Sequence, residues 1–113
     1  MDKALSNIKN IIWDWNGTLL DDIHLCVESI NILLHDRGLD KLSINTYRRI
    51  FGFPVKDYYQ RAGFNFDTED FKVPATQFIN LYNKSKNNCE LTEGAAETVQ
   101  FFHSKGFKQI ILS

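Results

Sequence analysis

The stretch Asn-Ile-Ile-Trp-Asp-Trp-Asn-Gly-Thr-Leu-Leu-Asp-Asp, residues 10–22, decides the fold of this chain. Its first half is an apolar run that ends in the acid Asp14, and the pair Asn16-Gly17 then breaks the run. Because both faces of the run are apolar, it predicts a buried strand over residues 10–14, of the kind found in parallel sheets. The turn at its carboxyl end is where open α/β sheets place their functional sites.

A series of helical patterns follows this strand. Apolar residues recur at steps of three and four, which predicts amphipathic helices. Asp21 and Asp22 suit the N-terminus of the first helix, and Ser43 and Pro54 suit the starts of later ones. Helices are expected over residues 21–38, 43–50, 54–63 and from Pro74 onward, followed by a polar loop over residues 83–88.

The last part of the sequence returns to a helix and a strand. A helix is expected over residues 95–103, and the apolar run Ile110-Ile111-Leu112 predicts a strand over 107–112, directly before Ser113. The predicted fold class is therefore α/β, with a sheet that is incomplete because two strands alone are not stable. The expected domains are a partial sheet domain, residues 1–20 and 92–113, and an inserted helical domain, residues 21–91.

Composition narrows the class of protein. The chain has 113 residues, of which 43% are hydrophobic and 24% charged, as in a soluble domain. A net charge of −1 excludes the basic surface that nucleic acids or acidic membranes require. The N-terminus lacks the apolar run of a secretory signal, so the cytoplasm is the expected location. Cys26 and Cys89 match no metal-binding spacing, and Cys26 falls on an apolar helical stripe, which favours a buried thiol.

Asp14 is the first candidate for chemistry. A carboxylate at the end of a buried strand, before a glycine turn, can act as a nucleophile or bind a divalent metal ion. Thr18 can donate its hydroxyl to a bound anion or cap a turn. The alternative is structural: Asp14 caps the turn, and Asn16-Gly17 supplies the turn geometry. The spacing alone leaves both interpretations open.

Residues 11–22 resemble the first motif of the haloacid dehalogenase-like (HAD) hydrolases, an apolar strand followed by Asp-x-Asp-Gly-Thr-Leu. The helical insert resembles the small α-helical cap of the phosphoglycolate phosphatase-like branch. Phe51-Gly52-Phe53-Pro54 looks like the substrate-specificity loop of that cap. Thr92-Glu93-Gly94-Ala95 and the strand that ends at Ser113 look like the return into a Rossmann-like core and its second motif. The resemblance covers nearly the whole chain in order.

The resemblance implies a role for each matching position. Asp14 would be the nucleophile that forms an aspartyl-phosphate, and its other oxygen would ligate Mg²⁺. The backbone carbonyl of Asn16 would be a second metal ligand, and Thr18 and Ser113 would hold the phosphoryl oxygens. The implied activity is Mg²⁺-dependent hydrolysis of a small phosphorylated metabolite.

Two departures from the family pattern stand out. Phosphatases of the family usually carry Asp where this chain has Asn16, and that acid protonates the leaving oxygen. An amide cannot do so, and general acid–base help contributes roughly 10²- to 10⁴-fold. Asn16 therefore predicts slow turnover or a substitute acid. The Lys and acids of the third and fourth motifs also have no counterpart here. The chain is therefore expected to be a fragment, a truncated product or one half of an assembly.

Two alternative functions follow from these departures. One is a non-catalytic remnant whose helical bundle packs against a partner. The other is a dehalogenase or another carbon-centred hydrolase, because a halide leaves without a proton.

An incomplete sheet also exposes an apolar edge, which predicts a homodimer or a complementing chain.

Other polar residues fit a structural role better than a chemical one. The three histidines are expected at the surface or at helix ends. Four cations near the Phe51 loop are expected on solvated helix faces. The alternative for these cations is contact with an anionic substrate. Phe51 and Phe53 could line a substrate pocket or simply pack within the cap. The histidines and the cations are His24, His35, His103, Arg48, Arg49, Lys56 and Arg61.

Overall fold

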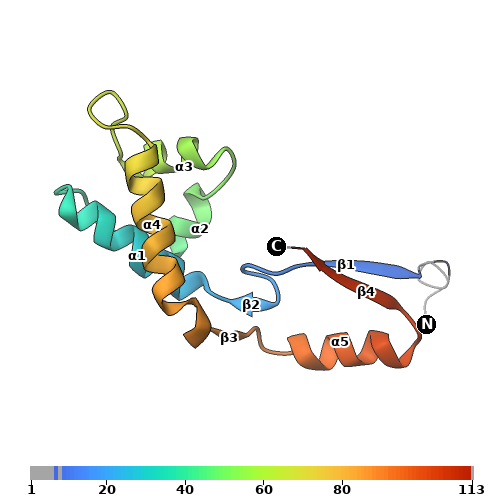
Figure 1. The fold of residues 1–113 in the computed structure, drawn as a ribbon. Helices are drawn as coiled ribbons and strands as arrows, with labels where there is room; N and C mark the ends of the chain where they lie inside the picture. The colour runs from blue at the N-terminus through green and yellow to red at the C-terminus, as the bar shows by residue number, and fades with distance from the viewer. Residues whose placement is uncertain (1–6, 8, 113) are drawn as a thin grey trace. The chain divides into compact units, whose positions relative to one another are not determined.

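The computed structural model describes residue 7 and residues 9–112. The chain divides into two compact units. The core unit contains the segments up to Asp22 and from Cys89 onward, and the helical unit is Ile23–Asn88. Figure 1 labels their helices and strands.

A parallel pair of strands forms the centre of the core unit. Strand β1 (Asn10–Asp14) pairs with β4 (Lys108–Leu112), in a register that sets Ile12 beside Ile110 and Asp14 beside Leu112. Helix α5 (Ala95–Ser104) precedes β4 and supplies the connection that brings it back parallel to β1. Both strands and the helix confirm the sequence-based expectation, within one residue at their ends.

Side chains from three elements hold the core unit together. The Trp13 indole Nε1 donates to Gln109 Oε1 at 2.8 Å, and Gln109 Nε2 donates to the Val99 carbonyl at 3.0 Å. The Trp13 ring also packs against Phe102 of α5, with ring centroids 6.4 Å apart. One face of the strand pair is therefore joined to the helix by packing and by hydrogen bonds.

The opposite face of the strand pair is open. Ile12 is 64% exposed and its cross-strand neighbour Ile110 is 46% exposed. The expectation of a strand buried on both faces is therefore wrong for this unit, because α5 covers only the face that carries Trp13. The strand itself lies where it was predicted.

A short antiparallel ribbon completes the core unit. Strand β2 (Leu20–Asp21) pairs with β3 (Glu90–Leu91), so that Leu20 faces Leu91 and Asp21 faces Glu90. The Thr92 backbone N–H extends the pairing by donating to the Leu19 carbonyl at 2.7 Å. The sequence does not predict this ribbon, because two-residue strands are too short to produce a hydropathy pattern.

The helical unit contains four α-helices, α1 (Ile23–Asp36), α2 (Ile44–Ile50), α3 (Val55–Ala62) and α4 (Lys72–Ser85), and a 3₁₀ turn, η1 (Lys86–Asn88). Ser43 caps α2, since its hydroxyl accepts from the Thr46 N–H at 3.1 Å. Gly63 ends α3 with φ of 117°, a conformation that other residues rarely adopt. No described helix is long and apolar enough to cross a bilayer.

Two sequence-based boundaries in the helical unit are wrong. Helix α4 begins at Lys72 rather than after Pro74, because proline is tolerated in the first helical turn and Asp70 Oδ1 accepts from the Lys72 N–H at 2.9 Å. The helix then continues to Ser85, so most of the expected polar loop over 83–88 is helical. The polar residues of that segment lie mostly exposed on the helix surface.

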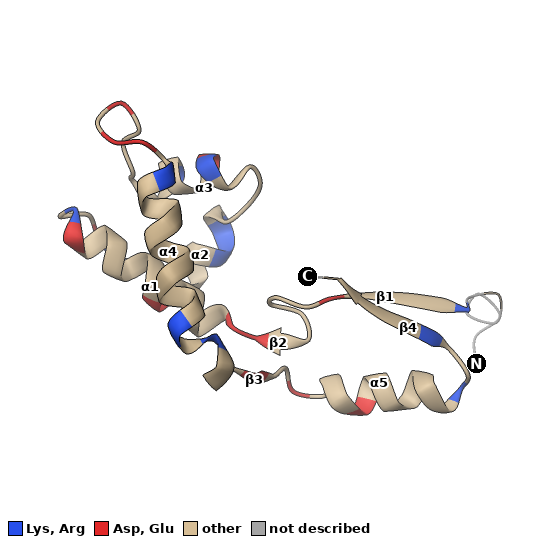
Figure 2. Cartoon of the chain, viewed as in Figure 1, with Lys and Arg blue, Asp and Glu red and all other residues tan. Residues whose placement is uncertain are grey.

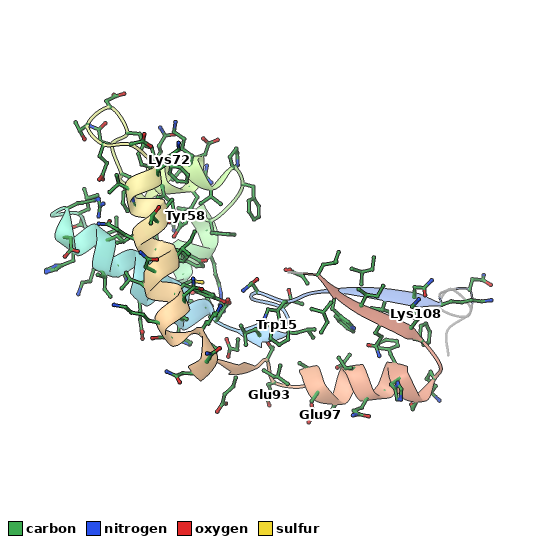
Figure 3. The ribbon with its side chains drawn as sticks, viewed as in Figure 1. Trp15, Tyr58, Lys72, Glu93, Glu97 and Lys108 are labelled. Carbon is green, nitrogen blue, oxygen red and sulfur yellow. The ribbon has the colours of Figure 1, made fainter. Side chains whose placement is uncertain are left out.

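Aromatic rings and α1 make the core of the helical unit. Ile30 and Leu34 of α1 are fully buried, and Tyr58 and Tyr59 of α3 are 2% and 3% exposed. Burial raises the pKa of Tyr58 far above its ordinary value and raises that of Tyr59 to about 12. The Tyr58 hydroxyl has no hydrogen-bond partner among the described residues. Figure 3 labels Tyr58 in the helical unit. The predicted buried thiol is not found at Cys26, which is only partly buried.

Arg37 ties three parts of the helical unit together. Its Nε and Nη2 donate to the two carboxylate oxygens of Glu69, at 2.6 and 3.1 Å. Nη2 also donates to Gln77 Oε1 of α4 at 2.9 Å, and the guanidinium lies 5.2 Å from the centre of the Phe64 ring. These bonds lower the pKa of Glu69 below its ordinary value.

Candidate active site

Asp14 is the last residue of β1 and its side chain is exposed. Because β1 and β4 are parallel and Asp14 is in register with Leu112, the carboxyl ends of both strands meet at one edge. Ser113, which was predicted together with Thr18 to hold the phosphoryl oxygens, follows Leu112 in sequence. It lies outside the described residues.

A tight loop after β1 holds the rest of the first motif. The Trp15 carbonyl accepts from the backbone N–H of Thr18 at 3.3 Å and of Leu20 at 2.9 Å, and the Gly17 N–H donates to the Leu20 carbonyl at 3.0 Å. Gly17 has φ of 72°, which favours glycine at this point of the loop. Figure 3 labels Trp15, whose carbonyl thus organises the loop just before β2.

The loop brings Thr18 back to the acid at the strand end. The Thr18 hydroxyl donates to Asp14 Oδ2 at 3.2 Å. Both side chains are exposed, so an oxyanion of a ligand can approach the pair from solvent. The structure therefore places a carboxylate nucleophile candidate and a hydroxyl donor within one hydrogen bond of each other.

Asn16 points its amide at a buried acid. Asn16 Nδ2 donates to Asp22 Oδ2 at 3.2 Å, and Asp22 is only 3% exposed. A side-chain Cβ added at Gly17 would lie 3.8 Å from Asp22 Oδ1, so the loop backbone also runs close to this carboxylate. From the sequence, Asp22 is expected only as a helix-end residue, because no local pattern relates an amide to an acid six positions later.

Negative charge gathers around the β2–β3 ribbon (Figure 2). Asp21 and Glu90 lie directly opposite each other on the two strands. Burial, and then the carboxylates of Asp22 and Asp21, raise the pKa of the Cys89 thiol. Acidic surroundings of this kind disfavour a thiolate, so Cys89 is not placed as a nucleophile.

The other predicted elements lie apart from the first motif in sequence. Residues Phe51, Gly52, Phe53 and Pro54 belong to the helical unit and connect α2 to α3, with Phe51 41% and Phe53 82% exposed. His24 and His35 of α1 and His103 of α5 are exposed, as expected for surface residues. Within the described part of the chain, no group of three or more His, Cys, Asp or Glu side chains could hold a metal ion.

Comparisons with known proteins agree with this architecture. The family model described as haloacid dehalogenase-like hydrolase matches residues 11–113. A solved structure, that of a predicted phosphoglycolate phosphatase from Haemophilus somnus 129pt, is similar with a TM-score of 0.72 and 25% sequence identity. The similarity covers 93% of this chain and 51% of the other, so this chain spans about half the length of that protein. No curated protein matches.

The family match extends over nearly the whole chain and includes the strand, the Asp14 loop and the return to β4. This chain belongs to the haloacid dehalogenase-like hydrolase family.

Proposed function

We propose that the chain is part of a Mg²⁺-dependent phosphatase that hydrolyses a small phosphorylated metabolite through an aspartyl-phosphate. One observation carries the proposal: the exposed Asp14 carboxylate stands at the end of β1, with the Thr18 hydroxyl 3.2 Å from its Oδ2. The family match and the likeness to a predicted phosphoglycolate phosphatase support the reaction class.

The residues at this edge partly fit a magnesium ion. Mg²⁺ prefers hard oxygen ligands in octahedral geometry. The Asp14 carboxylate and the backbone carbonyl of Asn16 would supply two such oxygens, and the remaining ligands would come from water, the phosphate and further acids. When bound, the ion would neutralise charge on the phosphoryl oxygens.

The reaction follows from what the chain's own groups can do. A carboxylate oxygen of Asp14 attacks phosphorus, the bond from phosphorus to the leaving oxygen breaks, and an aspartyl-phosphate forms. The Thr18 hydroxyl, which donates to Asp14 in the structure, would donate to a phosphoryl oxygen during transfer. Water then cleaves the aspartyl-phosphate, which releases phosphate and restores Asp14.

Asn16 limits this reaction to certain leaving groups. Its amide donates to Asp22 and cannot protonate the departing oxygen. A substrate whose leaving group is already a stable anion does not need that proton. We therefore expect p-nitrophenyl phosphate and acyl phosphates to be hydrolysed faster than simple alkyl phosphates.

Asn16 also keeps a second candidate function open. A halide leaves carbon without a proton, so the amide is no handicap in dehalogenation. In that reaction Asp14 would attack carbon and form an ester, which water then hydrolyses. Release of chloride from chloroacetate in the presence of a metal chelator would favour this candidate over the phosphatase.

The test of the phosphatase is Asp14→Asn, made in the whole protein. We expect hydrolysis of p-nitrophenyl phosphate in Mg²⁺ to fall by at least about 10³-fold, since the nucleophile is lost. Asp36→Asn is the matched control, because Asp36 is an exposed acid at the end of α1 and should leave the rate unchanged. Equal rates for Asp14→Asn and wild type would contradict the proposal.

A further inference from the structure

The core unit buries a carboxylate, Asp22, directly beside the loop that follows β1. Asp22 is the last residue of the unit's first segment and is 3% exposed. Among the buried residues of the described chain it is the only one that carries a charge. A buried carboxylate is costly unless hydrogen bonds replace the water that it has lost. Its partners therefore indicate what this side chain holds in place.

Both the side chain and the backbone of Asp22 meet the loop of residues 15–19. Its Oδ2 accepts from Asn16 Nδ2 at 3.2 Å, and its Oδ1 lies 3.8 Å from the position of a Cβ added at Gly17. Its backbone N–H donates to the Leu20 carbonyl at 3.1 Å, and the Gly17 N–H donates to the same carbonyl at 3.0 Å. Asp22 is thus fixed relative to two consecutive residues at the centre of the loop.

This loop carries two of the groups that the proposed reaction uses. The Asn16 backbone carbonyl is a proposed metal ligand, and the Thr18 hydroxyl donates to Asp14 Oδ2 at 3.2 Å. Between these two residues lies Gly17, which has φ of 72° and, as a glycine, restrains the backbone less than any other residue does. The bond from Asn16 to Asp22 supplies a restraint directly beside this glycine.

We propose that Asp22 is a positioning residue that holds the loop of residues 15–19 through the Asn16 amide. The held conformation is the one in which the Thr18 hydroxyl donates to Asp14. The inference rests on the proposed function and adds a residue to the same site. Asp22 is too buried to touch a substrate, so it acts through Asn16. An amide at position 16 suits this role because it donates to the carboxylate, which an ionised acid would repel.

Backbone motion of the loop tests the positioning role without any activity. In the whole protein we expect NMR order parameters of about 0.85 at Gly17 and Thr18 in wild type, and values below about 0.6 in Asp22→Ala. Asp22→Asn should match wild type, because its amide oxygen can accept the same hydrogen bond in nearly the same shape. Glu90→Ala removes an exposed acid from β3 of the same unit and should also match wild type.

Several results decide this part. Unchanged order parameters in Asp22→Ala would overturn the positioning role. A loop as mobile in Asp22→Asn as in Asp22→Ala would overturn it too, because the hydrogen bond would not be what holds the loop. Should Asp22→Ala fail to fold, Asn16→Ala removes the same bond from its exposed end. A rigid loop in Asn16→Ala would then overturn the role.

Kinetics test whether the held loop matters for the reaction. In the whole protein, Asp22→Ala should lower kcat for p-nitrophenyl phosphate about tenfold with KM within about twofold, since a misplaced loop weakens contacts in the transition state. Asp22→Asn should stay within about threefold of wild type. Adding Asn16→Ala to Asp22→Ala should cause no further loss, because both changes remove the same bond.

Three kinetic results would overturn the link to the reaction. They are an unchanged kcat in Asp22→Ala, an equal loss in Asp22→Asn, and losses that add in the double variant. A wild-type protein that hydrolyses no phosphate ester would refute the proposed function, while the order parameters would still decide whether Asp22 holds the loop.

Discussion

Replacing Asn16 with Asp would restore the usual acid of the family and place two carboxylates face to face. In wild type the Asn16 amide donates to Asp22 Oδ2 at 3.2 Å. The change removes that donor and sets the introduced carboxyl beside an acid that is only 3% exposed. We expect the free energy of unfolding of the core unit to fall at neutral pH.

The separation of the two groups sets the magnitude. At the 3.2 Å of the present contact, two unit charges repel by about 5 kcal/mol at an effective dielectric constant of about 20 and by about 1 kcal/mol in water. Position 16 is exposed, so the introduced side chain can turn toward solvent. We therefore expect a loss of about 2 kcal/mol at pH 7.

The loss should depend on pH in a definite direction. A neighbouring negative charge raises the pKa of the introduced carboxyl in the folded state above its unfolded value of about 3.9. The folded variant then binds its proton more tightly than the unfolded chain does. The destabilisation is thus complete above the folded pKa and disappears as the pH falls from about 6 to about 4.

Urea unfolding followed by tryptophan fluorescence measures this effect in the relevant unit, because both tryptophans, Trp13 and Trp15, lie in the core unit. The double variant Asn16→Asp/Asp22→Asn exchanges the acid and the amide, so it should regain stability to within about 1 kcal/mol of wild type. If Asn16→Asp were as stable as wild type at pH 7, or equally destabilised at pH 4, this reasoning would be refuted.

A general acid needs a raised pKa, which the introduced carboxyl at position 16 should have. Phosphatase activity of Asn16→Asp should therefore rise about 10²-fold over wild type.

Three further changes address the helical unit, each checked by thermal unfolding followed by circular dichroism. Tyr58→Phe should stabilise it by about 1 kcal/mol, because the lost hydroxyl is buried and has no hydrogen-bond partner among the described residues; a less stable variant would contradict this. Glu69→Gln should cost about 1 kcal/mol at pH 7, since the Glu69 side chain is 28% exposed. The bond from Arg37 lowers the pKa of Glu69, so this difference should persist at neutral pH and shrink as the pH falls below the ordinary value of 4.5. Leu34→Ala should cost about 2–5 kcal/mol, because Leu34 is fully buried, and a loss below about 1 kcal/mol would show a core that relaxes around the cavity.

Elements with strong local signals could be predicted from the sequence. The apolar run before Asp14, the cap residue Ser43 and the αL glycine Gly63 act through neighbouring backbone, so their effects are visible within a few residues. The expected loop over 83–88 failed because polarity alone does not end a helix whose solvent face is polar.

Contacts between residues without a shared pattern could not be predicted. The first motif indicated Asp14 and Thr18 through family resemblance, but the bond from the Asn16 amide to Asp22 depends on how the loop turns at Gly17. Arg61 reaches the end of another helix, and only the packing of α2 and α3 brings the two together. How deeply β1 and β4 are buried also depends on which elements cover them. The residues of the two strands do not indicate which elements these are.

The register of β1 with β4 also shapes how the chain folds. Asn10 pairs with Lys108, so the central strand pair joins segments from nearly opposite ends of the sequence. The entropy lost on closing so long a loop is paid before the strand contacts form, which slows folding. The helical unit and the Leu20–Leu91 pairing bring distant segments together in between. Once they have formed, the loop that remains to be closed between β1 and β4 is shorter. We therefore expect the inserted helices to fold before the strand pair.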